Sequence, residues 1–309
     1  MTRQWLFAGL TLACLCRPAW GMDYGGHAGS FLRVGAGARA QGLGCAYGAV
    51  AQGPAAAYWN PAGLARAEKK RLVLSHHSWS LDRSQRFLAY SQPMGGAGFG
   101  IAWLASGTDD IVERDTSGRS GEILADEQHA YLFSFGKQIL PTAAVGLTGK
   151  LLRYELAGQR ARGRAFDMGV LFSPKGWLAV AGVLRDCAGT VKWQNRRWEQ
   201  ESDREEKLPC TWSVGLAGRL AGGRLLVSVD LSLTEHLGGR AGIGAQFDVT
   251  RTVIVRAGVK DLSNNEAIEA AFAAGGSVSV SENLDLDGAY VTDPMDVRGS
   301  QVWSFNFRF

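Results

Sequence analysis

Apolar and polar residues alternate along most of this chain, and that two-residue period constrains its fold more than any other feature. In the last ten residues, "SQVWSFNFRF", Trp303, Phe305, Phe307 and Phe309 fall on one face, and the residues between them fall on the other. The runs "RLLVSVDLSL", "LDLDGAY" and "AYLFSFGK" repeat the pattern. Because successive side chains of a β-strand point to opposite faces, the pattern predicts strands from Arg71 onward.

Marking every such run gives about fourteen expected strands, with boundaries uncertain by about 2–4 residues. They are roughly 71–79, 83–92, 97–106, 127–137, 143–155, 163–173, 177–186, 209–220, 223–233, 240–249, 252–260, 268–281, 284–292 and 300–309. Every second connection is tight. The others are usually longer, and "GTDDIVERDTSGRSGEILAD" and "CAGTVKWQNRRWEQESDREEK" are much longer. An even strand number with short turns on one rim and long charged loops on the other is typical of a bacterial transmembrane barrel. We therefore expect an all-β fold, a transmembrane antiparallel β-barrel over residues 69–309.

Residues 1–21 have the composition of a secretory signal peptide. "MTRQ" carries positive charge, "WLFAGLTLACLC" is apolar, and Ala19 and Gly21 are small residues at the positions that signal peptidase reads. The alternative, a short anchor helix, needs about 18 apolar residues to span a membrane, and this run is shorter. No later run reaches that length either. The exported protein is therefore expected to be a β-barrel or a soluble protein.

The direction of the two strand faces follows from the cost of unpaired backbone groups in lipid. Each such group costs several kcal/mol, so strands cross a membrane only in a closed cylinder, with the bulky apolar face outward. Lys150, Asp230, Asp285 and Asp287 are then expected to line the lumen as solvated or paired charges. Acids at i and i+2 are common on a wet strand face, so Asp285 and Asp287 do not indicate catalysis.

The sequence indicates neither an enzyme nor a metal site. His76 and His77 are adjacent strand residues that point to opposite faces and cannot readily share one metal ion. No Ser/His/Asp constellation, phosphate-binding loop or Cys-x-x-Cys pair is visible, so we expect no catalysis and no cofactor. The net charge of the whole chain is +4, and its basic residues are scattered rather than clustered. A nucleic-acid partner is therefore not expected.

Cysteine positions leave two readings open. Cys187 and Cys210 bracket one polar segment and could form a disulfide in an oxidising compartment. The alternative is two free thiols.

Residues 22–68 precede the first expected strand, on the periplasmic side, and are rich in glycine and alanine. A barrel of about fourteen strands has a bore wide enough to need filling, and small side chains allow close contact with its wall. We therefore expect a plug in the lumen. In its last part, Tyr58 and Trp59 supply bulk, Asn60 is the expected N-cap and Pro61 the first residue of a short helical turn, followed by Ala62 and Gly63. The alternative is an ordinary loop before a strand.

The stretch "FLRVGAGARAQGLGCAYGAVAQGPAAAYWNPAGLA" resembles the N-terminal signature of the PorV/PorQ family, within the FadL-type superfamily of outer-membrane barrels. The resemblance covers about 35 residues, and the rest agrees in strand number and loop asymmetry. Cys45 and Gln52–Pro54 depart from the family pattern. The terminal strand with Phe305, Phe307 and Phe309 is similar to the signal that barrel-assembly machinery reads. The resemblance implies a place in the outer membrane of a Gram-negative bacterium, in contact with its lipid.

Two functions follow from the resemblance. The first is a plugged channel for hydrophobic small molecules such as long-chain fatty acids; the Gly-rich strands "GGAGFG" and "AAGG" are expected to mark kinks or bulges that help to open it. The second is a partner of a type IX-like secretion machine that binds secreted proteins, with Trp193 and Trp198 exposed among the charges of a long loop. A soluble β-sandwich that binds a ligand is the alternative outside the barrel class.

Overall fold

The computed structural model describes residues 27–114, 116–194, 204–263, 270–293 and 296–309. The predicted signal peptide, residues 22–26 of the predicted plug, and Trp198 lie outside the described residues. The described strands are β1 (Arg71–Ser78), β2 (Arg83–Pro93), β3 (Ala97–Arg114), β4 (Ser120–Leu140), β5 (Ala143–Leu156), β6 (Gln159–Lys175), β7 (Leu178–Gln194), β8 (Arg204–Lys207), β9 (Thr211–Leu220), β10 (Leu225–Thr234), β11 (Gly238–Asp248), β12 (Val253–Leu262), β13 (Ala271–Ser281), β14 (Leu284–Asp293) and β15 (Asp296–Arg308).

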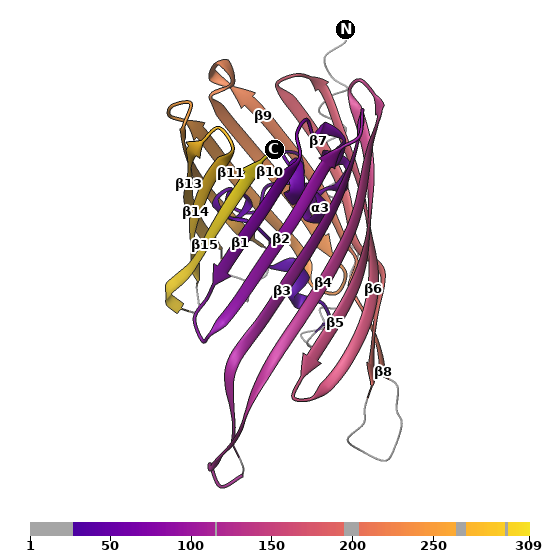
Figure 1. Ribbon diagram of the computed structural model, residues 1–309, viewed down its shortest axis with the longest axis vertical. Coiled ribbons are helices and arrows are strands. Elements are labelled where there is room, and N and C mark those ends of the chain that lie inside the picture. The colour runs from indigo at the N-terminus through magenta and orange to yellow at the C-terminus, as the bar shows by residue number, and fades with distance from the viewer. Residues whose placement is uncertain (1–26, 115, 195–203, 264–269, 294–295) are drawn as a thin grey trace.

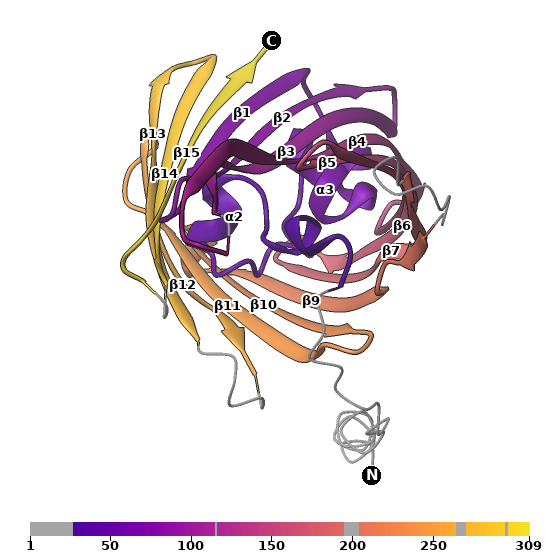
Figure 2. The same ribbon diagram turned by 90° about the horizontal axis from the view of Figure 1, so that it is seen from below.

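Fourteen of these strands close into one antiparallel barrel (Figures 1 and 2). The hydrogen-bonded order runs from β6 down to β1, continues through β15 down to β9, and returns to β7, which pairs with β6. The short strand β8 pairs with β7 only and stands outside the ring. The prediction of an all-β, closed transmembrane barrel is confirmed.

Two connections that the sequence predicted as long loops are largely strand, so that part of the prediction was wrong. The pairing of β3 with β4 continues to Arg114 and Ser120, and this hairpin projects well beyond the barrel (Figure 1). Likewise β7 continues to Gln194 and pairs with β8. Many of these residues are charged, so the alternation of apolar and polar residues is weak there. Backbone pairing holds them as strands, helped in β7 and β8 by the ion pair of Lys192 with Glu205 at 3.2 Å. We call this end of the barrel the long-loop rim and the opposite end the short-turn rim.

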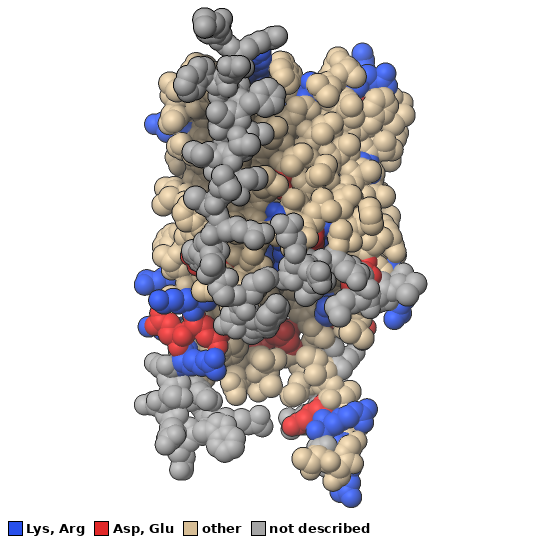
Figure 3. Space-filling model, turned by 180° about the vertical axis from the view of Figure 1, so that it is seen from behind, with Lys and Arg blue, Asp and Glu red and all other residues tan. Residues whose placement is uncertain are grey.

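The apolar strand face points outward. On β4, Tyr131, Phe133 and Phe135 are 41%, 53% and 46% exposed, whereas the intervening Ser134 is 2% exposed. Figure 3 shows the consequence: on that face most acidic and basic side chains lie toward the long-loop rim, and much of the barrel wall above them is uncharged. The terminal residues Phe305 and Phe309 are exposed in the same way.

Residues 27–68, which we call the luminal segment, lie inside the ring of strands (Figure 2). Their short helices are η2 (Ser30–Arg33), α2 (Ala38–Gly42), η3 (Gly53–Ala55), α3 (Ala56–Trp59) and η4 (Pro61–Arg66); a further turn, η5 (Ala221–Gly223), joins β9 to β10. None of the helices in the described ranges has the length and apolar character needed to cross a membrane.

The luminal segment runs through the bore from one rim to the other. At its start the ring of His27 stacks on that of His236, in the β10–β11 connection at the long-loop rim, with centroids 5.9 Å apart. At its end Arg66 donates to Ser173 Oγ near the β6–β7 turn of the short-turn rim. The sequence predicted that the segment folds into the bore from the periplasmic, short-turn side. Its end does lie at the short-turn rim, but its start lies at the long-loop rim.

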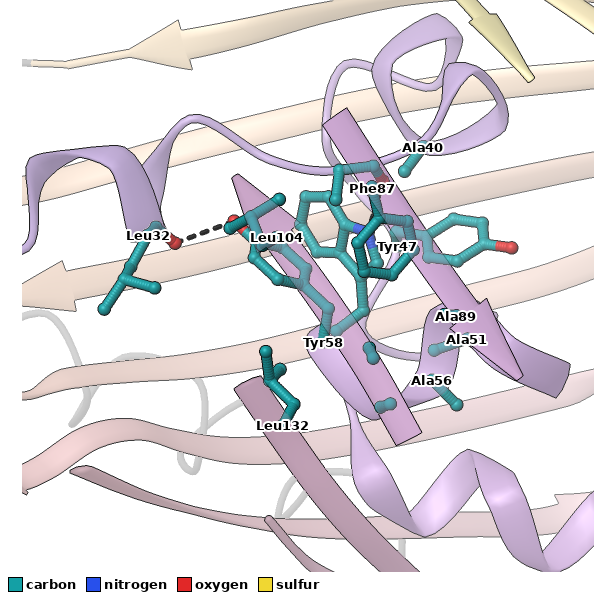
Figure 4. Close-up of a cluster of buried hydrophobic side chains, with 14 of the residues drawn as sticks. Leu32, Ala40, Tyr47, Ala51, Ala56, Tyr58, Phe87, Ala89, Leu104 and Leu132 are labelled. Atoms are coloured by element: carbon teal, nitrogen blue, oxygen red, sulfur yellow. Dashed lines mark hydrogen bonds between the residues drawn. The ribbon is translucent and has the colours of Figure 1, made fainter. Parts of the chain in front are cut away.

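The main hydrophobic core lies between the luminal segment and the wall (Figure 4). Tyr58 packs edge-on against Phe87 of β2, with ring centroids 6.1 Å apart, and both are almost fully buried. Leu104 of β3 and Leu132 of β4 complete the wall side of this cluster. The small residues of the segment thus let it approach the wall, while a few bulky residues fill the remaining space.

Candidate functional site

Tyr58 and Trp59 tie the end of the luminal segment to its beginning. The Tyr58 hydroxyl donates to the Leu32 carbonyl at 2.7 Å (Figure 4) and accepts from the Gly35 amide at 3.0 Å. The indole of Trp59 donates to the Ala36 carbonyl at 2.9 Å. Each aromatic side chain therefore fills space and satisfies a buried polar group at the same time.

Asn60 is fully buried and makes three hydrogen bonds. Its amide nitrogen donates to the Gly48 carbonyl at 3.0 Å and to the Val170 carbonyl of β6 at 3.3 Å. Its amide oxygen accepts from the backbone N–H of Ala62 at 3.1 Å. This last bond caps η4, whose first residue is Pro61, so the short helical turn predicted from the sequence is present.

Wall glycines let the end of the luminal segment press onto strands β3 to β6. At Gly146 an added Cβ would stand 2.6 Å from the Pro61 carbonyl oxygen, and at Gly136 it would stand 3.0 Å from the Ala65 nitrogen. Any larger residue at these positions would force the segment away from the wall. Ala62, Gly63 and Leu64 lie near the end of the segment, and their small or compact side chains suit this contact.

A second glycine group receives the middle of the segment on β11 and β12. At Gly244 an added Cβ would stand 2.8 Å from Leu43 Cα, and at Gly258 it would stand 2.9 Å from Gly44 Cα. Gly44 itself adopts a φ of +59°, which favours glycine. The Gly-rich strands predicted as kinked or bulged are not bulged there, because the registers through Gly98 and Gly275 run without a shift. At Gly98 and Gly100 the missing side chain instead makes room for Leu64.

The acidic residues predicted to line the lumen all point inward and all have partners. Asp230 of β10 accepts from the backbone amides of Tyr47 and Gly48, at 3.0 and 2.7 Å, and so holds the luminal segment to the wall. Asp287 pairs with Arg256 at 3.3 Å, and Asp285 pairs with Arg308 at 2.7 Å.

Lys150 lies in a buried triad on the inner wall. Its ammonium group is 2.8 Å from Asp167 of β6 and 2.7 Å from Asp186 of β7. The Asp186 amide also donates to Asp167 at 2.9 Å. The strand alternation predicted Lys150 as a lumen residue but did not predict its partners. Asp167 falls on the inward face of an alternating run and could have been found; Asp186 sits at an irregularity of β7, with a φ of +58°, where alternation gives no guide.

Cys187 and Cys210 are joined by a disulfide, which resolves the choice left open by the sequence. The bond links β7 to the residue before β9 at the point where β8 branches from the ring. Cys45 is the free cysteine of the described chain, and burial raises the pKa of its thiol to about 11. No group of three metal-binding side chains is found in the residues that the structure describes.

Two cavities lie on either side of the middle of the luminal segment. The long-loop vestibule, of about 400 Å³, is lined by residues that include Arg33, Cys45, Trp59 and Arg185. The short-turn vestibule, of about 290 Å³, is lined by residues that include Arg39, Tyr47, Arg71 and Phe87. Residues 34–47 contribute to both walls, so this part of the segment separates the two spaces. The middle of the luminal segment therefore lies between one cavity at the long-loop rim and another at the short-turn rim.

No protein-family model matches the sequence, and no curated protein matches it. Solved structures do match the fold. The toluene transporter TbuX of Ralstonia pickettii is 15% identical, with a TM-score of 0.63 over 89% of this chain and 98% of that chain. The monoaromatic hydrocarbon channel CymD is 13% identical, with a TM-score of 0.68 over 89% and 98%. A FadL homologue of Pseudomonas aeruginosa is 12% identical, with a TM-score of 0.60 over 88% and 97%.

The chain therefore has the fold of the FadL-type transmembrane barrels, along nearly its whole described length. At this level of identity the likeness establishes the fold alone. Membership of the PorV/PorQ family stays a prediction.

Proposed function

We propose that this protein is an outer-membrane channel of a Gram-negative bacterium that admits small hydrophobic compounds. The observation that carries the proposal is the fold that it shares, over 89% of its length, with a toluene transporter and a monoaromatic hydrocarbon channel. The two vestibules on either side of the luminal segment support it, because a solute that enters one must pass that segment to reach the other. Long-chain fatty acids are the finer candidate that the sequence resemblance suggests.

Passage in this proposal requires the luminal segment to move, and a cross-link can test that directly. A Cβ on Gly42 of α2 would stand 3.7 Å from the Ala289 Cβ of β14. Disulfides typically join Cβ atoms about 3.8 Å apart, so the double variant Gly42→Cys, Ala289→Cys is expected to lock α2 to the wall. The variant is made in a Cys45→Ser background so that no third thiol interferes.

Uptake of radiolabelled toluene and of oleate is measured in liposomes that contain the purified protein. The wild type is expected to take up at least one of them faster than empty liposomes do. The oxidised double variant is expected to lose this uptake and to regain it on reduction. Because reduction also breaks the native Cys187–Cys210 disulfide, the reduced wild type is measured as the control. Uptake no faster than that of empty liposomes would contradict transport. Uptake by the oxidised variant at the wild-type rate would contradict passage past α2.

A second function, binding of secreted proteins as a partner of a type IX-like secretion machine, is supported by the two hairpins at the long-loop rim. The β3–β4 and β7–β8 hairpins extend beyond the barrel wall, where another protein can reach them (Figure 1). Trp193 supports it less than the sequence suggested, because its ring packs 6.0 Å from that of Tyr154. Affinity capture from detergent-solubilised membranes tests this function, and recovery of no secretion component or secreted protein would contradict it.

A further inference from the structure

Arginine dominates the charge of the short-turn vestibule. Six arginines and three aspartates line it, so three positive charges are in excess; they are Arg39, Arg71, Arg219, Arg251, Arg256 and Arg308, against Asp248, Asp285 and Asp287. The long-loop vestibule is closer to balance, with four basic and three acidic side chains. The excess of positive charge therefore belongs to one end of the bore.

Three of these six arginines have carboxylate partners. Arg219, Arg256 and Arg308 form ion pairs with the three aspartates, at 3.8, 3.3 and 2.7 Å. Among the residues that the structure describes, Arg39 and Arg71 have no carboxylate within ion-pair distance.

Arg39 brings a buried hydrogen-bond donor to this cavity. Its Nε atom is buried and has no hydrogen-bond partner in the described part of the chain, and its guanidinium stands 5.8 Å from the ring centroid of Tyr47. The buried Nε of Arg308, which lines the same cavity, likewise has no hydrogen-bond partner among the described residues. Buried donors without partners cost free energy, and an oxygen-rich anion placed between them would supply acceptors.

The arginines also repel one another. Arg39, Arg71 and Arg308 all line this one cavity. Like charges in a concave site with low-dielectric walls concentrate a positive potential, which attracts anions. Guanidinium groups suit carboxylates and phosphates in particular, because two parallel N–H groups match two oxygens of the anion.

The rest of the wall favours an anion with an apolar part. Phe87, Val73 and Pro54 lie beside the arginines, and the Tyr47 ring forms another side. A volume of about 290 Å³ is at the small end of ligand sites in proteins. The lining therefore matches a small molecule with one charged end and a compact apolar body.

We propose that the short-turn vestibule is a binding site for a small organic anion, whose carboxylate or phosphate group is held by Arg39 and Arg71. The site is independent of the proposed transport function, because it requires binding from the short-turn side only. Arg39 lies on α2, but the two residues that the transport test joins, Gly42 and Ala289, do not line the site.

Binding is measured by calorimetry on the full-length protein in detergent, with benzoate, phenyl phosphate and the neutral benzamide as probes. We expect at least one anion to bind about tenfold or more tightly than benzamide, and the tighter of the two identifies the preferred group. Arg39→Gln and Arg71→Gln are each expected to weaken anion binding about tenfold to hundredfold, since each removes charged hydrogen bonds. Arg71→Lys, which keeps the charge, is expected to retain part of the affinity.

Arg153→Gln is the matched control, because it removes the same charge at a distance from the site. Arg153 lies on β5 toward the other rim, and its side chain is half exposed. It is expected to bind the anions as the wild type does. Heat-modifiable migration on gels verifies that each variant is a folded barrel. Equal affinity for benzamide and both anions, absence of binding, or equal losses in Arg39→Gln and Arg153→Gln would overturn the proposal.

Discussion

Replacing Gly146 by alanine tests whether the luminal segment is held against the wall by close backbone contact. The added Cβ would stand 2.6 Å from the Pro61 carbonyl oxygen, well inside ordinary van der Waals contact, and the atoms that it meets are backbone. Backbone cannot turn aside as a flexible side chain can. Overpacking of this kind typically costs about 1–3 kcal/mol, and we expect the upper part of that range.

Gly149 supplies the control within the same strand. An added Cβ there meets nothing within 4 Å, so Gly149→Ala adds the same methyl group without a clash. A cost of about 3 kcal/mol corresponds to roughly a hundredfold increase in local opening. Hydrogen exchange followed by mass spectrometry is therefore expected to show faster exchange over residues 58–66 in Gly146→Ala only, with β5 itself little changed. Equal exchange in the two variants would refute the packing described here.

Three further predictions concern single side chains. Asn60→Ala is expected to speed hydrogen exchange of the luminal segment about tenfold or more, because three hydrogen bonds are lost. Asn283→Ala, in an exposed turn, is expected to leave that exchange unchanged, and equal effects of the two substitutions would contradict the anchoring role of Asn60. Lys150→Met leaves two buried carboxylates without their cation and is expected to cost about 3–5 kcal/mol. Arg160→Met, in an exposed pair, is expected to change the stability little; thermal unfolding measures both variants, and similar shifts would be inconsistent with the triad. Burial raises the pKa of Cys45 to about 11, so at pH 8 its alkylation is expected to be about a hundredfold slower than in the unfolded protein and to accelerate as pH rises toward 11; fast alkylation independent of pH would count against this.

The ring strands were predictable from the sequence because two environments act on every one of them. Lipid outside and the luminal segment inside force alternation, as in β4, where Tyr131 and Phe133 are exposed and Ser134 is buried. The outer parts of β3, β4 and β7 lie beyond this constraint, and their strands were missed. The strand β8 was missed for the same reason, since its four residues are all charged.

The site was predictable only where its interactions are local in sequence. The Asn60 cap and Pro61 follow from a rule that spans a few residues, and both are present. The contacts that hold the luminal segment join residues far apart: Asn60 bonds a carbonyl 110 positions away, and Tyr47 bonds Asp230 183 positions away. No local pattern encodes such pairs.

In the luminal segment glycine was expected to allow close contact with the wall, and Gly44 lies against Val259. For the strand glycines the sequence predicted a kink or a bulge, and no bulge is found at Gly98 or Gly275. A glycine in a strand can mark a bulge or a close approach of another backbone, and the sequence does not distinguish them. At Gly98 the structure shows close approach, by Leu64 of the luminal segment. The arginines of the short-turn vestibule were not singled out, because they are dispersed in sequence and gather only when the barrel closes.

In a closed barrel embedded in lipid, each strand has one face toward the lipid and one face toward the bore. Nitroxide labels are placed singly from Tyr131 to Phe135 of β4 in the protein reconstituted into liposomes, and their collision rates with oxygen and with a water-soluble nickel chelate are measured. Labels at 131, 133 and 135 are expected to collide often with oxygen and rarely with the nickel chelate. Labels at 132 and 134 are expected to collide rarely with both reagents, because they face the packed bore. Equal access of nickel to all five positions would contradict the account.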